Sequence, residues 1–223
     1  MRALFKLAFT WCLGWMVLGP VVLSGQEGVG GLAYLRFVNA TGLPGKLFVT
    51  LDGEDINPEG YSDGFATGAV GFPAKICQVE FKHDGLGKVK VPVEIKAGEV
   101  TAVVALPIAE ESKKEGEPPE IKLGHQVVAS KKHQNGQPST ITVVQSSPAE
   151  LLNFTVGGVP VAAAKLKPVV APLNRGMGDF VAVKLGEKTL TTVNCTDPTD
   201  HVLFFFTDQK GVLKNVAFHN TVD

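Results

Sequence analysis

The sequence predicts an all-β protein made of two tandem antiparallel β-sandwich domains of the immunoglobulin-like kind, which follow a cleaved signal peptide. Three observations lead to this prediction. Apolar and polar residues alternate along many short segments, as expected for strands with one buried face. Such segments recur in the same order about 100 residues apart. No sustained 3.6-residue apolar stripe, the mark of an amphipathic helix, interrupts them.

The clearest repeat joins residues 46–53, K-L-F-V-T-L-D-G, to residues 151–158, L-L-N-F-T-V-G-G. Both runs alternate, and each ends in a dipeptide, Asp52-Gly53 or Gly157-Gly158, that favours a hairpin turn. Further matches follow in the same order: 76–81 with 180–185, 91–95 with 190–195, and 102–107 with 202–207. We therefore expect two copies of one β unit, each closing over an apolar core of its own.

The first domain is expected at residues 27–130 and the second at 140–223. Residues 131–139 are expected to be the linker, because this stretch is polar and rich in turn-forming residues. The nearly continuous apolar runs 100–106 and 202–206 predict central strands. Pro92 cannot donate a ladder hydrogen bond, so its strand is expected at an edge of its sheet.

Residues 1–25 have the features of a secretory signal peptide. Arg2 and Lys6 supply a positive start, and the apolar stretch that follows is broken by Gly19-Pro20. A membrane anchor, the alternative, needs about 20 unbroken apolar residues. The run L-S-G-Q places Gln26 where a lipoprotein signal needs its lipidated cysteine. We expect a periplasmic or secreted protein whose mature chain has no membrane anchor.

Composition argues against several classes of function. Loss of Arg2 and Lys6 with the signal leaves 19 basic against 22 acidic residues, a net charge of about −3, so no nucleic acid partner is expected. The chain has no G-x-S-x-G motif, and its five histidines lack the helical spacing or C-x-x-C neighbours of a metal site. They are expected to be isolated surface or strand-end residues. We predict no enzyme, no cofactor and no metal; for the acidic run 52–63, a solvated turn is favoured over a Ca²⁺ site.

Two cysteines remain in the mature chain, Cys77 and Cys195. A secreted protein with two cysteines could form a disulfide. The repeat instead places Cys77 at the position of Val181 and Cys195 at the position of Ile95, in different cores. Bridged cysteines need Cα atoms within about 7 Å of each other. Two buried free thiols are the favoured interpretation.

Two glycine-laced loops, 64–75 and 173–180, each precede the third alternating strand of their unit. Arg175 and Asp179 are the most conspicuous polar residues there and form a candidate recognition loop, with turn geometry as the alternative. A carbohydrate-binding protein is the alternative function, but the mature chain lacks tryptophan and has only Tyr34 and Tyr61 for stacking on sugars. The sequon Asn39-Ala40-Thr41 is interpreted as incidental.

Across residues 32–107 the chain resembles a family of bacterial envelope proteins. The runs of this chain that carry the resemblance are L-R-F-V-N-A-T-G, L-F-V-T-L-D-G, G-F-P-A-K before a strand, and V-E-I-K-A-G-E-V-T-A-V-V-A-L. This pattern is similar to that of the periplasmic alginate O-acetylation protein AlgF and related β-sandwich domains, although Lys75 replaces the usual glycine and the second unit is only faintly similar. The resemblance implies tandem β-sandwiches without catalytic residues. It also implies an exported adaptor or scaffold, acting with envelope or exported proteins in exopolysaccharide O-acetylation of the alginate type or in cell-envelope assembly, with a polysaccharide as a further partner.

Overall fold

The computed structural model describes residues 31–110, 119–131, 133, 137–173, 179–197 and 199–220. This part of the chain contains strands, turns and bends but no helix, so the all-β class is confirmed. None of the described residues belongs to a helix long and apolar enough to cross a membrane. The expected signal peptide, residues 1–25, lies outside the described residues.

The first half of the chain forms two four-stranded sheets, ordered β4-β1-β7-β8 and β3-β2-β5-β6. Apolar residues at alternate positions of both sheets meet in one core, as the period-two pattern predicts. Its strands are β1 (Ala33–Asn39), β2 (Leu47–Leu51), β3 (Glu54–Asp55), β4 (Val70–Phe72), β5 (Lys75–His83), β6 (Gly87–Ile95), β7 (Glu99–Glu110) and β8 (Glu120–Lys131).

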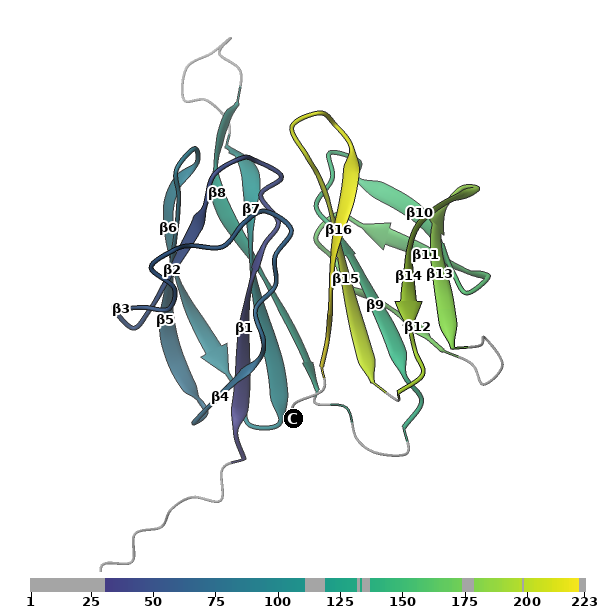
Figure 1. Cartoon of the computed structure of the whole chain (residues 1–223), viewed down its shortest axis with the longest axis horizontal. Helices are drawn as coiled ribbons and strands as arrows, with labels where there is room; N and C mark the ends of the chain where they lie inside the picture. Colours follow the sequence, from purple (N-terminus) through teal and green to yellow (C-terminus); the bar gives the residue numbers. More distant parts are fainter. Residues whose placement is uncertain are drawn as a thin grey trace, which may run out of the picture.

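The second half repeats this arrangement strand for strand, with sheets ordered β12-β9-β15-β16 and β11-β10-β13-β14 around a second core. The predicted repetition of one β unit is therefore confirmed at the level of topology. Its strands are β9 (Thr140–Gln145), β10 (Leu151–Val156), β11 (Val159–Ala164), β12 (Val169–Pro172), β13 (Phe180–Leu185), β14 (Lys188–Asn194), β15 (Asp200–Thr207) and β16 (Leu213–His219). We call the two halves the first and the second sandwich (Figure 1).

The expectation of purely antiparallel sheets is wrong, because each sandwich contains one parallel pair of strands. β1 runs parallel to β7, with Phe37 opposite Val103, and β9 runs parallel to β15 in the same way. A parallel pair cannot be joined by a hairpin. It arises here because the chain visits the other sheet of the sandwich between the two strands.

Strand positions within the sheets agree with the sequence. β7 and β15, which contain the apolar runs 100–106 and 202–206, each lie between two neighbours. β6 is an edge strand, so Pro92 lies where a missing donor costs least. β8 ends at Lys131 and β9 begins at Thr140. The domain limits and the linker assignment stay predictions.

A third apolar core lies between the two sandwiches, and it corrects the expectation that each copy closes only over its own interior. The outer faces of the β1–β7–β8 and β9–β15–β16 sheets pack against each other, so the four sheets form a stack (Figure 1). The buried residues of this core are Val38, Ala40, Ala102, Val104, Leu106 and Val128 from the first sandwich and Val144, Val202, Phe204, Phe206, Val216 and Phe218 from the second.

Polar contacts border this third core at both ends. Arg36 of β1 is 4% exposed; its guanidinium donates a 2.8 Å hydrogen bond to the carbonyl oxygen of His219 and lies 4.9 Å from the centre of the Phe218 ring. Burial lowers the pKa of Arg36. At the other end, Gly42 has a φ of +67°, and a Cβ there would lie 2.3 Å from the carbonyl oxygen of Thr207. Glycine thus lets the two backbones meet.

Candidate binding surfaces on the outer sheets

The stack leaves two sheets with a free face, β3-β2-β5-β6 in the first sandwich and β11-β10-β13-β14 in the second. Their inner faces carry the sandwich cores, and the other two sheets cover each other. The free faces therefore point to opposite sides of the molecule (Figure 1). A surface that recognises a partner is most accessible there.

Each free face carries a strongly exposed large apolar side chain at the same position of the repeat. Ile76 on β5 is 69% exposed and Phe180 on β13 is 67% exposed, the two highest values among the exposed large apolar residues described. Both residues lie at the start of corresponding strands, Ile76 on β5 opposite Glu94 and Phe180 on β13 opposite Asn194. Each is out of phase with the inward residues that follow, such as Cys77 and Val181. This difference in phase is visible in the sequence and is the signal by which both residues could be found.

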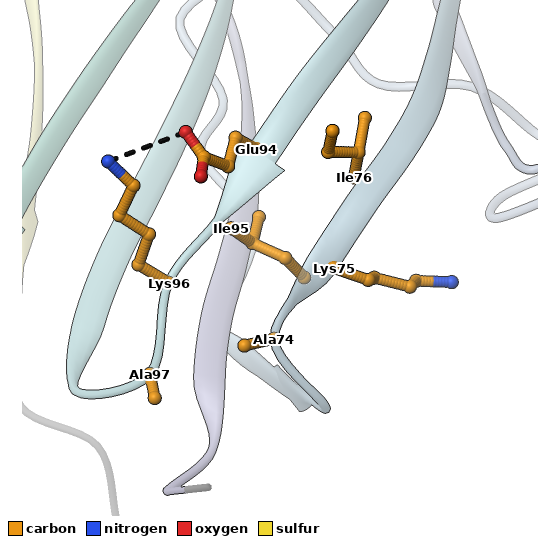
Figure 2. Close-up of a pocket in the computed structure, with 7 residues that line it drawn as sticks. All are labelled: Ala74, Lys75, Ile76, Glu94, Ile95, Lys96 and Ala97. Carbon is orange, nitrogen blue, oxygen red and sulfur yellow. Dashed lines mark ion pairs between the residues drawn. The ribbon is translucent and has the colours of Figure 1, made fainter.

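A shallow pocket of about 300 Å³ adjoins Ile76 at the end of the β5–β6 hairpin. In Figure 2, Lys96 and Glu94 lie on one side of it, where their charged groups are 3.4 Å apart, and Lys75 extends away on the other side. The seven lining residues are Ala74, Lys75, Ile76, Glu94, Ile95, Lys96 and Ala97. An apolar floor with charged sides suits a protruding apolar side chain of a partner better than a reactive substrate.

The charges around this pocket are already paired within the chain. The Lys75 ammonium contacts the Asp52 carboxylate at 2.5 Å, and the Gln78 amide donates a 2.7 Å hydrogen bond to the same carboxylate. The Lys75 hydrogen bond, followed by the Gln78 amide, lowers the pKa of Asp52, and the same ion pair raises the pKa of Lys75. These bonds assign Asp52 and Lys75 a role in holding the turn, and they favour that role over general acid or base chemistry.

Two other acids of residues 52–63 also accept hydrogen bonds from protein groups. Asp55 accepts a hydrogen bond from the Thr50 hydroxyl, and Asp63 accepts one of 2.9 Å from the Gly42 amide. Among the described residues, no three His, Cys, Asp or Glu side chains lie close enough to hold a metal ion. The arrangement gives a Ca²⁺ site in this loop no support.

The predicted recognition loop is not assembled by the described residues. Arg175 lies outside them. Asp179 is exposed immediately before β13, and its carbonyl oxygen accepts a 2.7 Å hydrogen bond from the Cys195 amide. The structure thus ties the backbone of Asp179 to the end of β14, while the exposed group beside it is the Phe180 ring.

The interpretation of the histidines as isolated surface or strand-end residues is partly wrong. His201 and His219 are opposite each other on β15 and β16, and Nδ1 of His133 lies 3.3 Å from the Asp200 carboxylate. His83 is fully buried at the end of β5. Desolvation lowers the pKa of His83, and it lowers that of His201, which the neighbouring His219 lowers further. Spacing along the chain could not reveal these groupings, because they depend on strand register.

Both cysteines are free, as expected, and they belong to different cores: Cys77 is buried in the first sandwich, and Cys195 packs against the core of the second. Cys195 is only partly buried, which corrects the expectation of two buried thiols. Desolvation raises both thiol pKa values, so neither is poised as a nucleophile.

Comparison with known proteins adds no relative from which a function could be transferred. No protein-family model matches the chain, and no curated protein matches it at a significant level.

Proposed function

We propose that this protein is an exported, non-catalytic adaptor that holds two partner proteins on opposite sides of a rigid β body. The observation that carries the proposal is the repeated exposure of Ile76 and Phe180 on the two free faces. A single exposed apolar residue needs no explanation on a protein surface. The same position exposed in both copies, one on each flank, supports a pair of docking points.

The third core supports a scaffold role as well. Twelve buried residues join the sandwiches face to face, so the two free faces keep a fixed separation and orientation. A scaffold needs this property, because a flexible tether would leave partners free to move relative to each other. Burial of an Ile or Phe side chain in a partner contributes about 1.5–3 kcal/mol, which suffices for an anchor in a transient interface.

The resemblance in residues 32–107 supports placing this adaptor in the bacterial envelope, in exopolysaccharide O-acetylation of the alginate type or in envelope assembly. In this proposal residues 1–25 are removed on export, and each sandwich is a variant of the immunoglobulin-like type. The partners are envelope or exported proteins.

Substitution of the two exposed residues tests the proposal. Tagged full-length protein, with Ile76→Asp, Phe180→Asp or both, is purified from envelope extract of its own organism, and the co-purifying proteins are quantified. Each single variant is expected to lose one partner by about tenfold or more, and the double variant both. Val170→Asp is the matched control, because Val170 is 57% exposed on β12, outside the two free sheets. Unchanged partner recovery with the double variant would falsify the proposal.

A carbohydrate-binding function is the second candidate, favoured by one observation. The rings of Tyr61 and Phe65 stack with centres 5.4 Å apart and planes 8° apart, and Phe65 is 47% exposed. Sugar rings bind to such aromatic faces. Electrophoresis in gels that contain alginate or another acidic polysaccharide tests this: retardation that Phe65→Ala removes supports it, and unretarded wild-type protein excludes it for those polymers.

A further inference from the structure

The two sandwiches differ along one side, where β6 faces β8 in the first sandwich and β14 faces β16 in the second. In the first sandwich this side is closed. Leu86, in the turn between β5 and β6, is 9% exposed, and Leu123 on β8 is 3% exposed. The Leu123 amide donates a 3.1 Å hydrogen bond to the Leu86 carbonyl oxygen and thereby ties the two sheets together.

The described residues of the second sandwich do not provide this closure. Its corresponding turn, between β13 and β14, consists of Gly186 and Glu187 and carries no apolar side chain to take the place of Leu86. Leu213 opens β16 opposite Thr207, as Leu123 lies opposite Pro107 on β8, and Leu213 is only partly buried. The apolar edge of the second core is therefore left partly open to water.

The inward side chains of β6 are better buried than those at the corresponding positions in or next to β14. Val91 and Ile95 on β6 are 6% and 2% exposed. Their counterparts in the second sandwich are Thr191 and Cys195, and both are only partly buried. A register shift near Val183 also interrupts the pairing of β13 with β14. At these two positions the second copy thus has a weaker apolar border, whereas Val193 between them is buried in the core.

The edge of β14 is also suited to pair with another strand. Within the described part of the chain, β14 pairs with β13 and with no other strand, at the end of its sheet. Edge strands are commonly protected against further pairing by proline and lysine, and β6 carries Pro92 together with Lys88 and Lys90. β14 reads K-T-L-T-T-V-N, with no proline and with its single lysine at the first position. The residues between its two ends are threonine, leucine and valine, which suit a strand that pairs with a further strand.

We propose that an extended segment of a partner polypeptide adds to the β11-β10-β13-β14 sheet beside β14 and inserts one leucine-sized side chain over Leu190 and Leu213. The first sandwich shows what the second lacks: an aliphatic side chain on a backbone that bridges the two sheets, supplied there by Leu86. Main-chain hydrogen bonds along β14 fix the segment, and the side chain closes the open core. This inference deepens the adaptor function by naming the chemistry of one partner.

The test uses the full mature chain and a phage-displayed library of short random peptides. Selected peptides are synthesised, and their dissociation constants are measured by fluorescence anisotropy. We expect peptides with strand propensity and one essential leucine or isoleucine, whose affinity falls by about tenfold or more in Leu190→Asp. A second variant replaces Gly186-Glu187 by the turn of the first sandwich, Asp84–Gly87, which supplies its own leucine. It is expected to lose binding while circular dichroism shows an intact fold.

Ile76→Asp is the control for both variants, and it is expected to bind the peptides as the wild type does. Peptides that bind the turn variant as well as the wild type would overturn the inference. A dimer of the wild-type chain in sedimentation that Leu190→Asp dissociates would also overturn it, because a second copy would then occupy β14. Peptide binding as expected, together with unchanged partners in Ile76→Asp/Phe180→Asp, would keep this inference and refute the proposed pair of docking points.

Discussion

The two sandwiches have one topology but fill their cores differently. In the first, the rings of Phe37 on β1 and Phe81 on β5 meet edge to face at 6.1 Å. In the second, Phe154 on β10 and Phe205 on β15 stack at 4.7 Å. Large side chains have thus changed strands between the copies. A sandwich needs a filled volume and the right pattern of inward positions, and either set of strands can supply the aromatic pair.

Where the copies agree, a shared physical requirement is visible. At the end of β1, the Asn39 side-chain oxygen accepts hydrogen bonds from the amide and hydroxyl of Thr41. At the end of β9, the Gln145 side-chain oxygen accepts the same two bonds from Ser147. Both amides are buried, at 1% and 0% exposure. A strand that ends inside a core needs its next backbone groups satisfied, and each copy solves this with a side-chain amide.

This agreement explains the sequon at Asn39. Its amide nitrogen donates a 3.0 Å hydrogen bond to the carbonyl oxygen of Tyr61, so the group that would carry a glycan is buried and bonded. The Asn-x-Thr spacing is a turn motif here. The interpretation of the sequon as incidental now has a structural reason.

The largest effect is expected from the core between the sandwiches, where Phe204 is fully buried. Phe204→Ala should lower the free energy of unfolding by about 3–5 kcal/mol, because it removes a large apolar side chain and leaves a cavity. The matched control is Phe180→Ala, since Phe180 is 67% exposed; it should change stability by about 0.5 kcal/mol or less. Urea unfolding monitored by circular dichroism measures both. Equal losses would contradict the buried interface.

This third core shows how far the sequence could predict the fold. Leu47, Val49 and Leu51 alternate so regularly that one buried face was clear. The runs 100–106 and 202–206 were interpreted only as central strands. Yet the outer face of a free sandwich would be wet, and a strand that is apolar on both faces indicates a further layer. The two runs thus indicate a further layer as well as central strands, and only the central strands were expected.

The candidate site was less predictable than the fold, for a physical reason. Ile76 and Phe180 become conspicuous only when their exposed fractions are known. The pairing of His201 with His219 depends on the register of β15 and β16, which no local pattern specifies. Arg175 and Asp179 were candidates because they are polar and lie in a glycine-laced loop. Arg175 lies outside the described residues, and the large exposed apolar group next to Asp179 is the Phe180 ring.

The second prediction concerns the buried amides that both copies share. Asn39→Ala and Gln145→Ala should each lower the free energy of unfolding by about 1–3 kcal/mol, because each leaves buried backbone groups without a partner. Thermal unfolding followed by calorimetry measures the two losses. Losses that differ by more than about twofold would show that the two turns are not equivalent, despite their matching hydrogen bonds.

The third prediction uses His83, a buried residue of the first sandwich whose Nδ1 accepts a hydrogen bond from the Gly85 amide. Desolvation lowers its pKa, and the nearby Asp84 and Asp63 carboxylates oppose this shift. The folded state therefore binds a proton less readily than the unfolded chain does. Its contribution to stability is complete above the unfolded pKa of about 6.5 and is lost as the pH falls from there through the lowered pKa.

His83→Asn keeps a hydrogen-bond acceptor and does not titrate. The melting temperature of the wild type should fall more steeply between about pH 7 and pH 5 than that of the variant. His133→Asn is the comparison variant, because His133 lies in the connection between β8 and β9, against Asp200 and outside the core of the first sandwich. Parallel wild-type and His83→Asn profiles would contradict the assignment of the acid sensitivity to His83.

The smallest effect is expected at the turn after the second strand, where the copies differ by one charge. Asp52 has a φ of +52° and is paired with Lys75, whereas Gly157 holds the same place in the second copy. Asp52→Asn keeps a residue that tolerates this backbone conformation and an oxygen for the Gln78 amide. The pKa of Asp52 is lowered, chiefly by Lys75. Its contribution is therefore present above the unfolded carboxyl pKa and is lost as the pH falls through the lowered value.

The melting temperatures of wild type and variant should nearly coincide at neutral pH and high salt, since exposed ion pairs are screened. At low salt the wild type should be slightly more stable, and the difference should vanish on acidification; a difference that persists in acid would mean that turn geometry, and not charge, distinguishes the copies.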